Sequence, residues 1–146
     1  MGSEMCIRDR DGVSIRDGSG LAESGRITCA ALADILEVAG PESAFANSLS
    51  VSGERGSLRQ WFLNTPADRR VRAKTGTLND VISLSGYILP EGNGGEFILF
   101  TYVANGPAAA TEPSVQEARD LLVLSIAEYP EGPSLADVSP TQATRR

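Results

Sequence analysis

The sequence predicts an α/β (α+β) fold in which an antiparallel sheet packs against helices. Three apolar runs between residues 71 and 103 are separated by short turns, a pattern typical of an antiparallel meander. Segments with helical periodicity precede and follow these runs. The chain has 146 residues, of which 41% are hydrophobic, so we expect one domain or a part of one.

The first helix is predicted over residues 29–38. A turn with two glycines, Asp-Gly-Ser-Gly-Leu at residues 17–21, precedes it. Thr28 is a suitable N-cap, and Gly40-Pro41 ends the helix. The apolar residues expected on one helical face are Leu32, Ile35, Leu36 and Ala39.

The signals are weaker between this helix and the sheet. A second glycine-rich turn, Gly-Glu-Arg-Gly-Ser-Leu, ends at Leu58. Trp61 and Phe62 follow it at helical spacing, and we interpret Trp61 as a packing residue. Arg69 and Arg70 lie in the polar loop that follows, where they are expected to be solvated charges.

Three strands are predicted, at residues 71–78, 81–89 and 97–103. Asn79-Asp80 is a turn signal, so the first two strands should pair as an antiparallel hairpin. The third strand is apolar on both faces, as expected for a strand that is covered on both sides. Lys74 is expected to lie on an edge strand of this meander.

A closing helix is predicted from about Ser114 to Glu128. Ser114 and Glu117 have the spacing of a capping box, which would make Ser114 the N-cap. The apolar stripe expected to cover the sheet consists of Val115, Ala118, Leu122 and Ile126.

The two ends of the chain are predicted to lie outside the fold. Residues 1–10 have no periodicity and resemble translated sequencing-adapter sequence, so they are interpreted as a non-native leader. Residues 130–146 contain several prolines and are predicted to be a disordered tail. Residues 11–129 are then the structured part.

Composition excludes several classes of function. The net charge is −6, which argues against nucleic acid or an anionic membrane surface as a partner. The absence of histidine excludes a Ser-His-Asp triad and most zinc sites within this chain. The two cysteines, Cys6 and Cys29, have no metal-like spacing, and neither a metal nor a cofactor is expected. No apolar run is long enough to form a transmembrane segment.

The chemically most informative stretch is Val-Arg-Ala-Lys-Thr-Gly-Thr-Leu at residues 71–78, which contains Lys74, the only lysine. Lys-Thr-Gly on a strand is one of three signatures of active-site serine penicillin-binding enzymes. An ammonium group can attract a substrate carboxylate, and the Thr75 hydroxyl can hydrogen-bond it. Gly76 lets a substrate backbone lie close to the strand. The same triplet is also an ordinary strand ending, so it does not decide the function alone.

The order of several motifs makes the resemblance specific. Asp-Gly-Ser-Gly-Leu, a helix, Gly-x-x-Gly-Ser-Leu, Ala-Lys-Thr-Gly-Thr-Leu and Ser-Leu-Ser-Gly-Tyr follow one another along the chain. Over residues 17–129 this resembles the C-terminal part of the D-alanyl-D-alanine carboxypeptidase/endopeptidase family, the class C penicillin-binding proteins (peptidase family S13).

The resemblance implies a β-lactamase/transpeptidase-like domain and a serine-type hydrolase of the cell wall. Its substrate would be a peptidoglycan stem peptide, its inhibitors β-lactams, and its location periplasmic or otherwise extracytoplasmic. No signal peptide is visible in this chain, because residues 1–10 lack an apolar run.

The resemblance also implies roles for four residues. Lys74 would supply positive charge, and the backbone N–H of Thr77 would be one donor of the oxyanion hole, which makes these two the catalytic candidates. Thr75 would bind the substrate carboxylate, and Gly76 would leave room for the peptide.

Two motifs of the family are missing. The chain contains neither Ser-x-x-Lys, which carries the nucleophile, nor Ser-x-Asn. A C-terminal fragment that is inactive by itself is therefore predicted. Two alternatives stay open: a fragment of a β-lactamase-like hydrolase, and a non-enzymatic binding module with the same fold. The coding sequence upstream of Met1 would discriminate between them.

Overall fold

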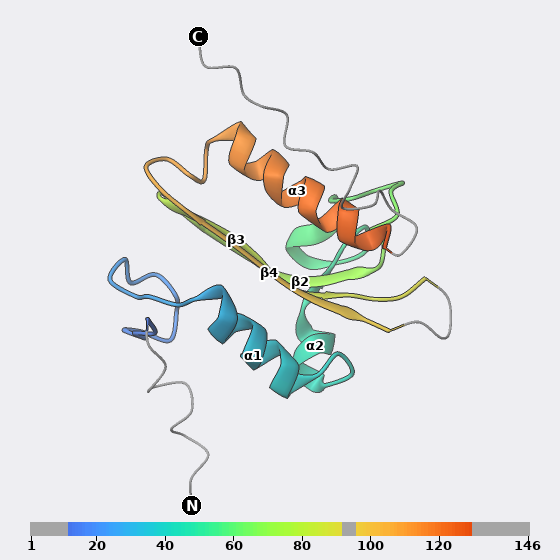
Figure 1. The fold of residues 1–146 in the computed structure, drawn as a ribbon, viewed down its shortest axis with the longest axis horizontal. Coiled ribbons are helices and arrows are strands. Elements are labelled where there is room, and N and C mark those ends of the chain that lie inside the picture. Colours follow the sequence, from blue (N-terminus) through green and yellow to red (C-terminus); the bar gives the residue numbers. More distant parts are fainter. Residues whose placement is uncertain (1–11, 92–95, 130–146) are drawn as a thin grey trace, which may run out of the picture.

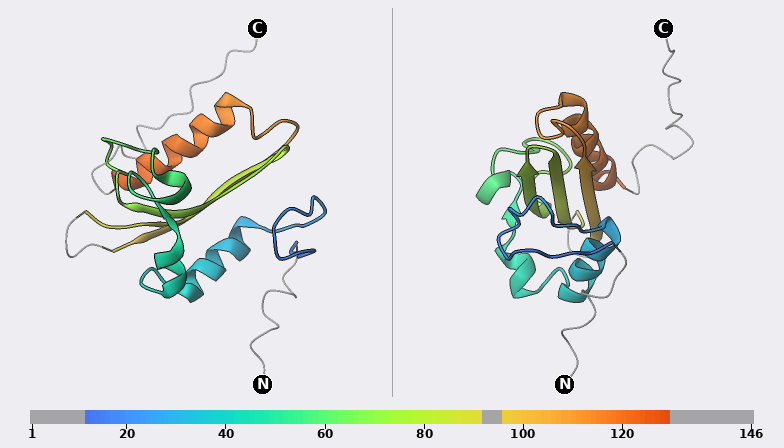
Figure 2. Two further views of the ribbon diagram at one scale, coloured as in Figure 1. Left: turned by 180° about the vertical axis from the view of Figure 1, so that it is seen from behind. Right: turned by 90° about the vertical axis from the view of Figure 1, so that its left-hand side faces the viewer.

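The computed structural model describes residues 12–91 and 96–129. In this part of the chain a sheet lies between two helices, α1 (Cys29–Ala39) on one face and α3 (Pro113–Ala127) on the other (Figure 1). The same layers are visible from behind and from the side (Figure 2). This arrangement confirms the predicted fold class. The predicted leader and tail lie outside the described residues.

The sheet has four strands that follow one another in chain order, and every neighbouring pair is antiparallel. The strands are β1 (Ser50–Val51), β2 (Val71–Leu78), β3 (Val81–Ile88) and β4 (Ile98–Asn105). The predicted meander is confirmed as β2, β3 and β4. Its first turn is tight, since Leu78 pairs with Val81 across Asn79-Asp80.

The expectation that Lys74 lies on an edge strand is wrong, because β1 pairs with β2 on that side. The pairing is short and joins only Ser50 to Ala73 and Val51 to Arg72. β1 ends where the chain turns back at Gly53, which has a φ of 65°. Among the described residues, the rest of β2 pairs with β3 but has no strand on the side of β1.

Side chains of the sheet alternate between two cores, as the period of a strand requires. β3 contributes to both, since Leu84 belongs to the core under α3 and Tyr87 to the core under α1. The predicted cover on both sides of the third strand is confirmed, because Phe100 lies in the first core and Leu99 packs against the second. The Tyr87 hydroxyl donates to the carbonyl of Leu36 at 2.6 Å, which satisfies a buried polar group.

Helix α1 begins as predicted. The N–H of Ala31 donates to the Thr28 hydroxyl at 3.1 Å, so Thr28 is the N-cap. The helix continues to Ala39, one residue beyond the predicted end. Gly40 then ends it with a φ of 77°, a conformation that suits glycine.

The weak signals before the sheet correspond to short elements that were not predicted. Helix α2 (Ala44–Ser48) precedes β1, and a single 3₁₀ turn, η1 (Gly56–Leu58), follows it. No helix forms through Trp61 and Phe62, because the φ of Phe62 is 60°. Trp61 is a packing residue, as predicted, and the Arg119 guanidinium lies 4.2 Å from its ring centroid.

Helix α3 differs from the prediction in its cap and in its buried face. Ser114 is not the N-cap, since the helix begins at Pro113 and the Ser114 hydroxyl donates to the Glu112 carboxylate. Proline suits this first position because its missing N–H would have no helical partner there. The buried stripe is Arg119, Val123 and Ala127, whereas the predicted Ala118 and Leu122 are exposed.

A charged residue can occupy this buried stripe because its charge is matched. The guanidinium of Arg119 pairs with Asp120 at 2.7 Å, and its flat face stacks on Trp61. The predicted stripe is wrong for Ala118 and Leu122 only, since Val115 and Ile126 are half-buried and Ile126 packs against the core under α3.

Arg70 also differs from expectation, because it is half-buried rather than solvated. Its guanidinium donates to the carbonyl oxygens of Leu89, Pro66 and Ala127 at 2.8, 2.8 and 2.9 Å. Arg69 is exposed, as predicted.

Candidate active site

The Lys-Thr-Gly-Thr stretch lies on β2, on the part that extends beyond β1. Lys74 and Thr77 are exposed, while Thr75 and Gly76 are half-buried. Because side chains alternate along a strand, Thr75 and Thr77 share the sheet face of α3, and Lys74 and Gly76 share the face of α1. The four predicted residues are therefore neighbours on one strand, but their side chains are divided between two faces.

The start of β2 is held by Ser52, which is fully buried. Its hydroxyl donates to the carbonyl of Ala67 at 2.7 Å and accepts from the N–H of Val71 at 3.1 Å. The N–H of Ser52 in turn donates to the carbonyl of Val71 at 3.0 Å. These bonds fix both the position and the rotation of the strand that carries the motif.

The register determines where the backbone groups of β2 point. In an antiparallel pair, positions that exchange hydrogen bonds alternate with positions that do not. The N–H of Leu89 donates to the carbonyl of Arg70 at 2.9 Å, so even-numbered residues of β2 bond to β3. The odd-numbered ones point to the other side, as the bonds between Val71 and Ser52 show.

The same alternation directs the N–H groups of Thr75 and Thr77 away from β3. Beyond Ala73 there is no strand on that side in the described part of the chain. No acceptor for either N–H is found among residues 12–91 and 96–129. The strand thus presents an open edge whose donors can bind a ligand, and we call the backbone from Lys74 to Thr77 the open edge of β2.

Lys74 pairs across the sheet with Ser85. Its ammonium group donates to the carbonyl of Thr75, its own neighbour on the strand. The positive charge therefore lies beside the open edge, where an anion bound to that edge would meet it.

Gly76 lies opposite a side chain of the neighbouring strand. It pairs with Ser83, and a Cβ at position 76 would lie only 2.3 Å from the Ser83 hydroxyl oxygen. The sequence also predicts that Gly76 leaves room for a peptide. That prediction concerns the backbone of Gly76 at the open edge of β2, not the side that faces Ser83. Because the Ser83 hydroxyl can rotate, this contact by itself does not require a glycine at position 76.

Two serines that the sequence did not single out join the site. The hydroxyl oxygens of Ser57 and Thr75 are 3.1 Å apart, and those of Ser50 and Ser57 are 3.2 Å apart. Ser50 belongs to β1 and Ser57 to η1. The available signal was the Gly-x-x-Gly-Ser turn, but nothing local indicates that it contacts a strand 18 residues later.

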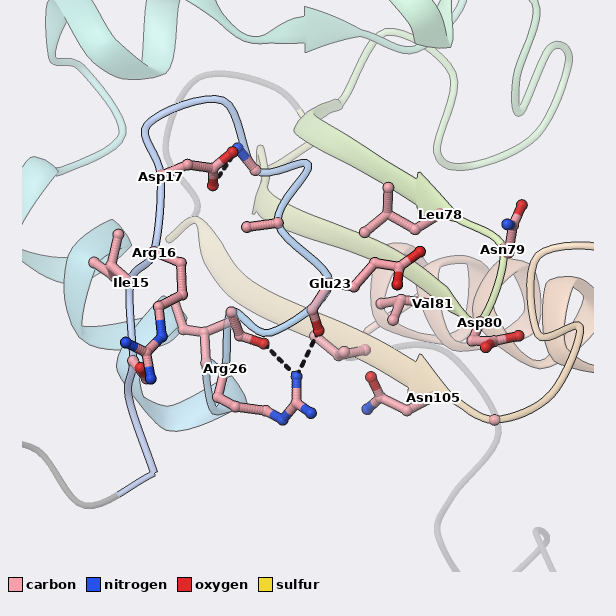
Figure 3. A pocket seen from close by; sticks show the side chains of 17 residues that line it. Ile15, Arg16, Asp17, Glu23, Arg26, Leu78, Asn79, Asp80, Val81 and Asn105 are labelled. Atoms are coloured by element: carbon pink, nitrogen blue, oxygen red, sulfur yellow. Dashed lines mark hydrogen bonds between the residues drawn. The ribbon is translucent and has the colours of Figure 1, made fainter.

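A hollow of roughly 800 Å³ lies at the turn of the β2–β3 hairpin, between the loop of residues 14–27 and the ends of β2, β3 and β4 (Figure 3). Its lining includes Leu78 but none of the Lys-Thr-Gly-Thr residues. The Arg26 guanidinium donates hydrogen bonds to the carbonyl groups of Glu23 and Gly25, and Figure 3 shows these two bonds as dashed lines. The hollow thus begins next to the open edge, at the residue after Thr77, but shares no residue with it.

Asp17 organises the loop on the other side of this hollow. Its carboxylate accepts hydrogen bonds from the Ser19 hydroxyl and from the N–H groups of Gly20 and Leu21. The hydrogen bond from Ser19 is the main cause that lowers the pKa of Asp17; desolvation opposes it, and the backbone hydrogen bonds lower the pKa further. The predicted Asp-Gly-Ser-Gly-Leu turn is thus an Asx-type turn closed by its first residue.

No group of three or more potential metal ligands occurs in the described residues. The candidate site is accordingly built from hydroxyl groups, one ammonium group and backbone N–H donors. Such groups can bind a carboxylate and stabilise a developing oxyanion.

Comparison with known proteins identifies relatives of the whole described region. The model of the D-Ala-D-Ala carboxypeptidase 3 (S13) family matches residues 6–128. A D-alanyl-D-alanine carboxypeptidase of an Actinomadura species is 35% identical over 138 residues, which are 85% of this chain and 24% of that protein. A penicillin-sensitive carboxypeptidase A of Dictyostelium discoideum is 34% identical over 116 residues, 74% of this chain and 22% of that protein.

Two solved structures have a fold that is similar to that of this chain. Penicillin binding protein 4 of Haemophilus influenzae, crystallised with a β-lactam, superposes with a TM-score of 0.63 at 25% identity, over 80% of this chain and 29% of that one. A predatory endopeptidase of Bdellovibrio bacteriovorus, at 19% identity and a TM-score of 0.64, shares the fold. The chain spans about a quarter of the length of the curated relatives, between 22% and 24%. Because the family model matches residues 6–128, which are most of the sequence, this chain belongs to the D-Ala-D-Ala carboxypeptidase 3 (S13) family.

Proposed function

We propose that this chain forms one wall of the active site of a serine-type D-alanyl-D-alanine carboxypeptidase/endopeptidase that acts on peptidoglycan stem peptides. The observation that carries the proposal is the open edge of β2, where the N–H groups of Thr75 and Thr77 have no strand partner and the Lys74 ammonium lies beside them. Membership of the S13 family supports the choice of reaction.

A peptide substrate would lie against the open edge as an additional strand. This mode of binding uses main-chain hydrogen bonds for affinity, and the free N–H groups supply the donors. Lys74 and the Thr75 hydroxyl would bind the terminal carboxylate of the peptide. Gly76, which has no side chain, would allow close approach along the backbone.

The Thr77 N–H would stabilise the oxyanion that forms when a serine attacks the scissile carbonyl. In that step the serine oxygen bonds to the carbonyl carbon, the amide bond breaks, and the terminal D-Ala leaves with a proton on its nitrogen. Water then hydrolyses the ester. The attacking serine is expected in a Ser-x-x-Lys motif, which these 146 residues do not contain.

β-Lactams carry a carboxylate and a strained amide, so they would bind the same edge. The Haemophilus protein with which this chain superposes was crystallised with such a compound. An extracytoplasmic location follows from a substrate that lies in the cell wall.

The test uses a full-length S13 protein that carries residues 12–129 of this chain. Incubation with benzylpenicillin should give one covalent adduct by intact-mass measurement, and a peptide that ends in D-Ala-D-Ala should release D-alanine. Rapid turnover of penicillin without peptide hydrolysis would favour the β-lactamase-like alternative. Reversible binding of the peptide without an adduct would favour a binding module.

A further inference from the structure

We propose that Ser57 is a positioning residue that orients the hydroxyl of Thr75 for binding a carboxylate. It would do so through a chain of three hydroxyl groups, Ser50, Ser57 and Thr75. This inference rests on the proposed function, because it assigns the carboxylate subsite at the open edge of β2.

The chain of hydroxyl groups is continuous. The Ser57 N–H donates to the Ser50 hydroxyl oxygen at 3.1 Å, and the two hydroxyl oxygens lie 3.2 Å apart. The Ser57 hydroxyl oxygen then lies 3.1 Å from that of Thr75. Both distances between hydroxyl oxygens allow either atom to be the donor.

The positioning role uses one of the two directions that this chain allows. A hydroxyl has one proton to donate and two lone pairs to accept with. Ser50 accepts from the Ser57 N–H with one lone pair and can donate its own proton to the Ser57 oxygen. Ser57 then donates to Thr75, which leaves the Thr75 proton for an acceptor at the open edge. Hydrogen bonds that run in one direction strengthen each other, so an anion there would reinforce the whole chain.

The surrounding turn fixes Ser57 in place. Gly56 has a φ of 69°, and a Cβ on it would lie 2.3 Å from the Ser50 hydroxyl oxygen, so only glycine lets the turn approach β1 this closely. On the other side of Ser57, Leu58 is fully buried in the core under α3. Ser57 itself is exposed, and its hydroxyl lies between those of Ser50 and Thr75.

This arrangement separates Ser57 from the catalytic groups. Removing its hydroxyl leaves the N–H of Thr77 and the charge of Lys74 in place, but it frees the Thr75 hydroxyl to rotate. We therefore expect weaker binding of ligands that carry the carboxylate, with little change in the acylation step that follows binding.

The experiment measures acylation of the same full-length protein by benzylpenicillin and by its methyl ester, which lacks the carboxylate. Ser57→Ala should lower acylation efficiency with the acid about three- to tenfold, as loss of one hydrogen bond to a charge-binding group implies. The loss should appear in the dissociation constant of the non-covalent complex with benzylpenicillin. The methyl ester should react equally with the parent protein and with Ser57→Ala. Ser57→Thr keeps a hydroxyl and should restore the rate.

A double-mutant cycle separates positioning from general stability. In a Thr75→Val background, Ser57→Ala should have no further effect, because the group that it orients is gone. Ser48→Ala removes another exposed serine hydroxyl, which bonds to the Phe45 carbonyl, and should react like the parent protein.

The outcomes distinguish the two proposals. A parent protein that no penicillin acylates would overturn the proposed function and this inference with it. If the parent is acylated but Ser57→Ala reacts equally fast, or loses as much rate with the ester as with the acid, only the positioning role fails. The positioning role also fails if Ser57→Ala lowers the rate in the Thr75→Val background as much as it does in the parent protein.

Discussion

Lys74 shows how one residue can have a large chemical role and a small structural one. Its side chain is exposed and donates only to the carbonyl of the next residue. Little apolar surface is buried by it, so its removal should leave the packing of β2 intact. Its charge, in contrast, lies beside N–H donors that have no partner in the described structure.

Replacing Lys74 by alanine should therefore lower acylation far more than stability. In the full-length protein we expect the second-order rate with benzylpenicillin to fall about a hundredfold or more, because a charge that acts in the transition state is lost. The free energy of unfolding should change by no more than about 0.5 kcal/mol, as is usual for surface substitutions. Both are measured on the same preparation.

Arg16→Ala is the matched control, because it removes one exposed positive charge in the loop near the hollow. It should acylate at the parent rate. If Lys74→Ala also did so, Lys74 would be an ordinary strand residue and the site assignment would fail.

Tyr87 gives a prediction on pH dependence. Burial raises the pKa of Tyr87, because the charged phenolate would lose its hydration. Its folded-state pKa thus lies above the unfolded value of about 10. The stability that it contributes is fully present below that value and is lost as the pH rises through the folded-state pKa.

Unfolding temperatures of this chain between about pH 8 and 11 should show the effect of Tyr87. Tyr87→Phe should be less stable at neutral pH, because the hydrogen bond to Leu36 is lost, but its unfolding temperature should fall less steeply at alkaline pH. Tyr129→Phe serves as a control, since Tyr129 is exposed. Parallel curves for the Tyr87 variant and the parent would rule out the assigned shift.

At the scale of elements, the contact between β2 and β3 places the whole candidate site. All eight residues of β2 pair with β3, and the pairing sets which backbone groups face the open edge. Gly86 pairs with Ala73 in this contact. A Cβ there would be 2.0 Å from the carbonyl oxygen of Arg72 and 2.6 Å from the Cα of Ala73, both backbone atoms that cannot move alone.

Gly86→Ala should consequently destabilise the chain by about 3 kcal/mol, the upper part of the usual range for overpacking. Urea unfolding followed by circular dichroism measures this. Gly18→Ala is the matched control, because nothing lies within 4 Å of a Cβ at that position and its φ is not positive. Equal stabilities for the two variants would contradict the close packing of β2 on β3.

Arg70 joins three elements that are distant in the sequence. Its guanidinium connects the loop before β2 to the end of β3 and to the last turn of α3. The positive charge also lies near the carbonyl end of the helix, where the helix dipole favours a cation.

We expect Arg70→Ala to lower the free energy of unfolding by about 2 kcal/mol, since three carbonyl groups, two of them in part-buried hydrogen bonds, lose a charged donor. Arg70→Lys should recover little of it, because one ammonium group cannot match a planar fork of donors. Arg59→Ala removes an exposed arginine and should change stability by no more than about 0.5 kcal/mol. Chemical denaturation distinguishes these outcomes.

At the scale of the molecule, two helices cover the sheet while one stretch of its second strand stays open. The layers of α1 and α3 give each face of the sheet its own core (Figure 1). The open edge of β2 lies between these layers, so a ligand there would contact the rim of the sheet rather than a face. The outer side of α3 exposes Leu121 and Leu122.

The purified chain by itself should form no covalent adduct with benzylpenicillin and release no D-alanine. The reason is that the chain contains no Ser-x-x-Lys motif, so the nucleophile is missing. Intact-mass measurement after incubation decides this, with the full-length protein as the positive control. A stoichiometric adduct on the isolated chain would show that another serine is the nucleophile.

The sequence by itself determined the elements whose signals are local. Strands β2 and β3 and the tight turn between them follow from apolar runs around Asn79-Asp80, and the start of α1 follows from Thr28. The family and the four candidate residues from Lys74 to Thr77 follow from the order of short motifs. Each element and each single motif depends on residues within a few positions of one another, and the family depends on the order of these motifs along the chain.

Only the tertiary structure decided which distant groups meet. It placed β1 beside the first half of β2, placed Arg119 in the buried stripe of α3, and brought Ser57 into contact with Thr75. These contacts depend on how whole elements pack and on the register between strands. A hydroxyl or an arginine has the same local sequence whether its partner is water or another element, and so the sequence alone could not distinguish the two.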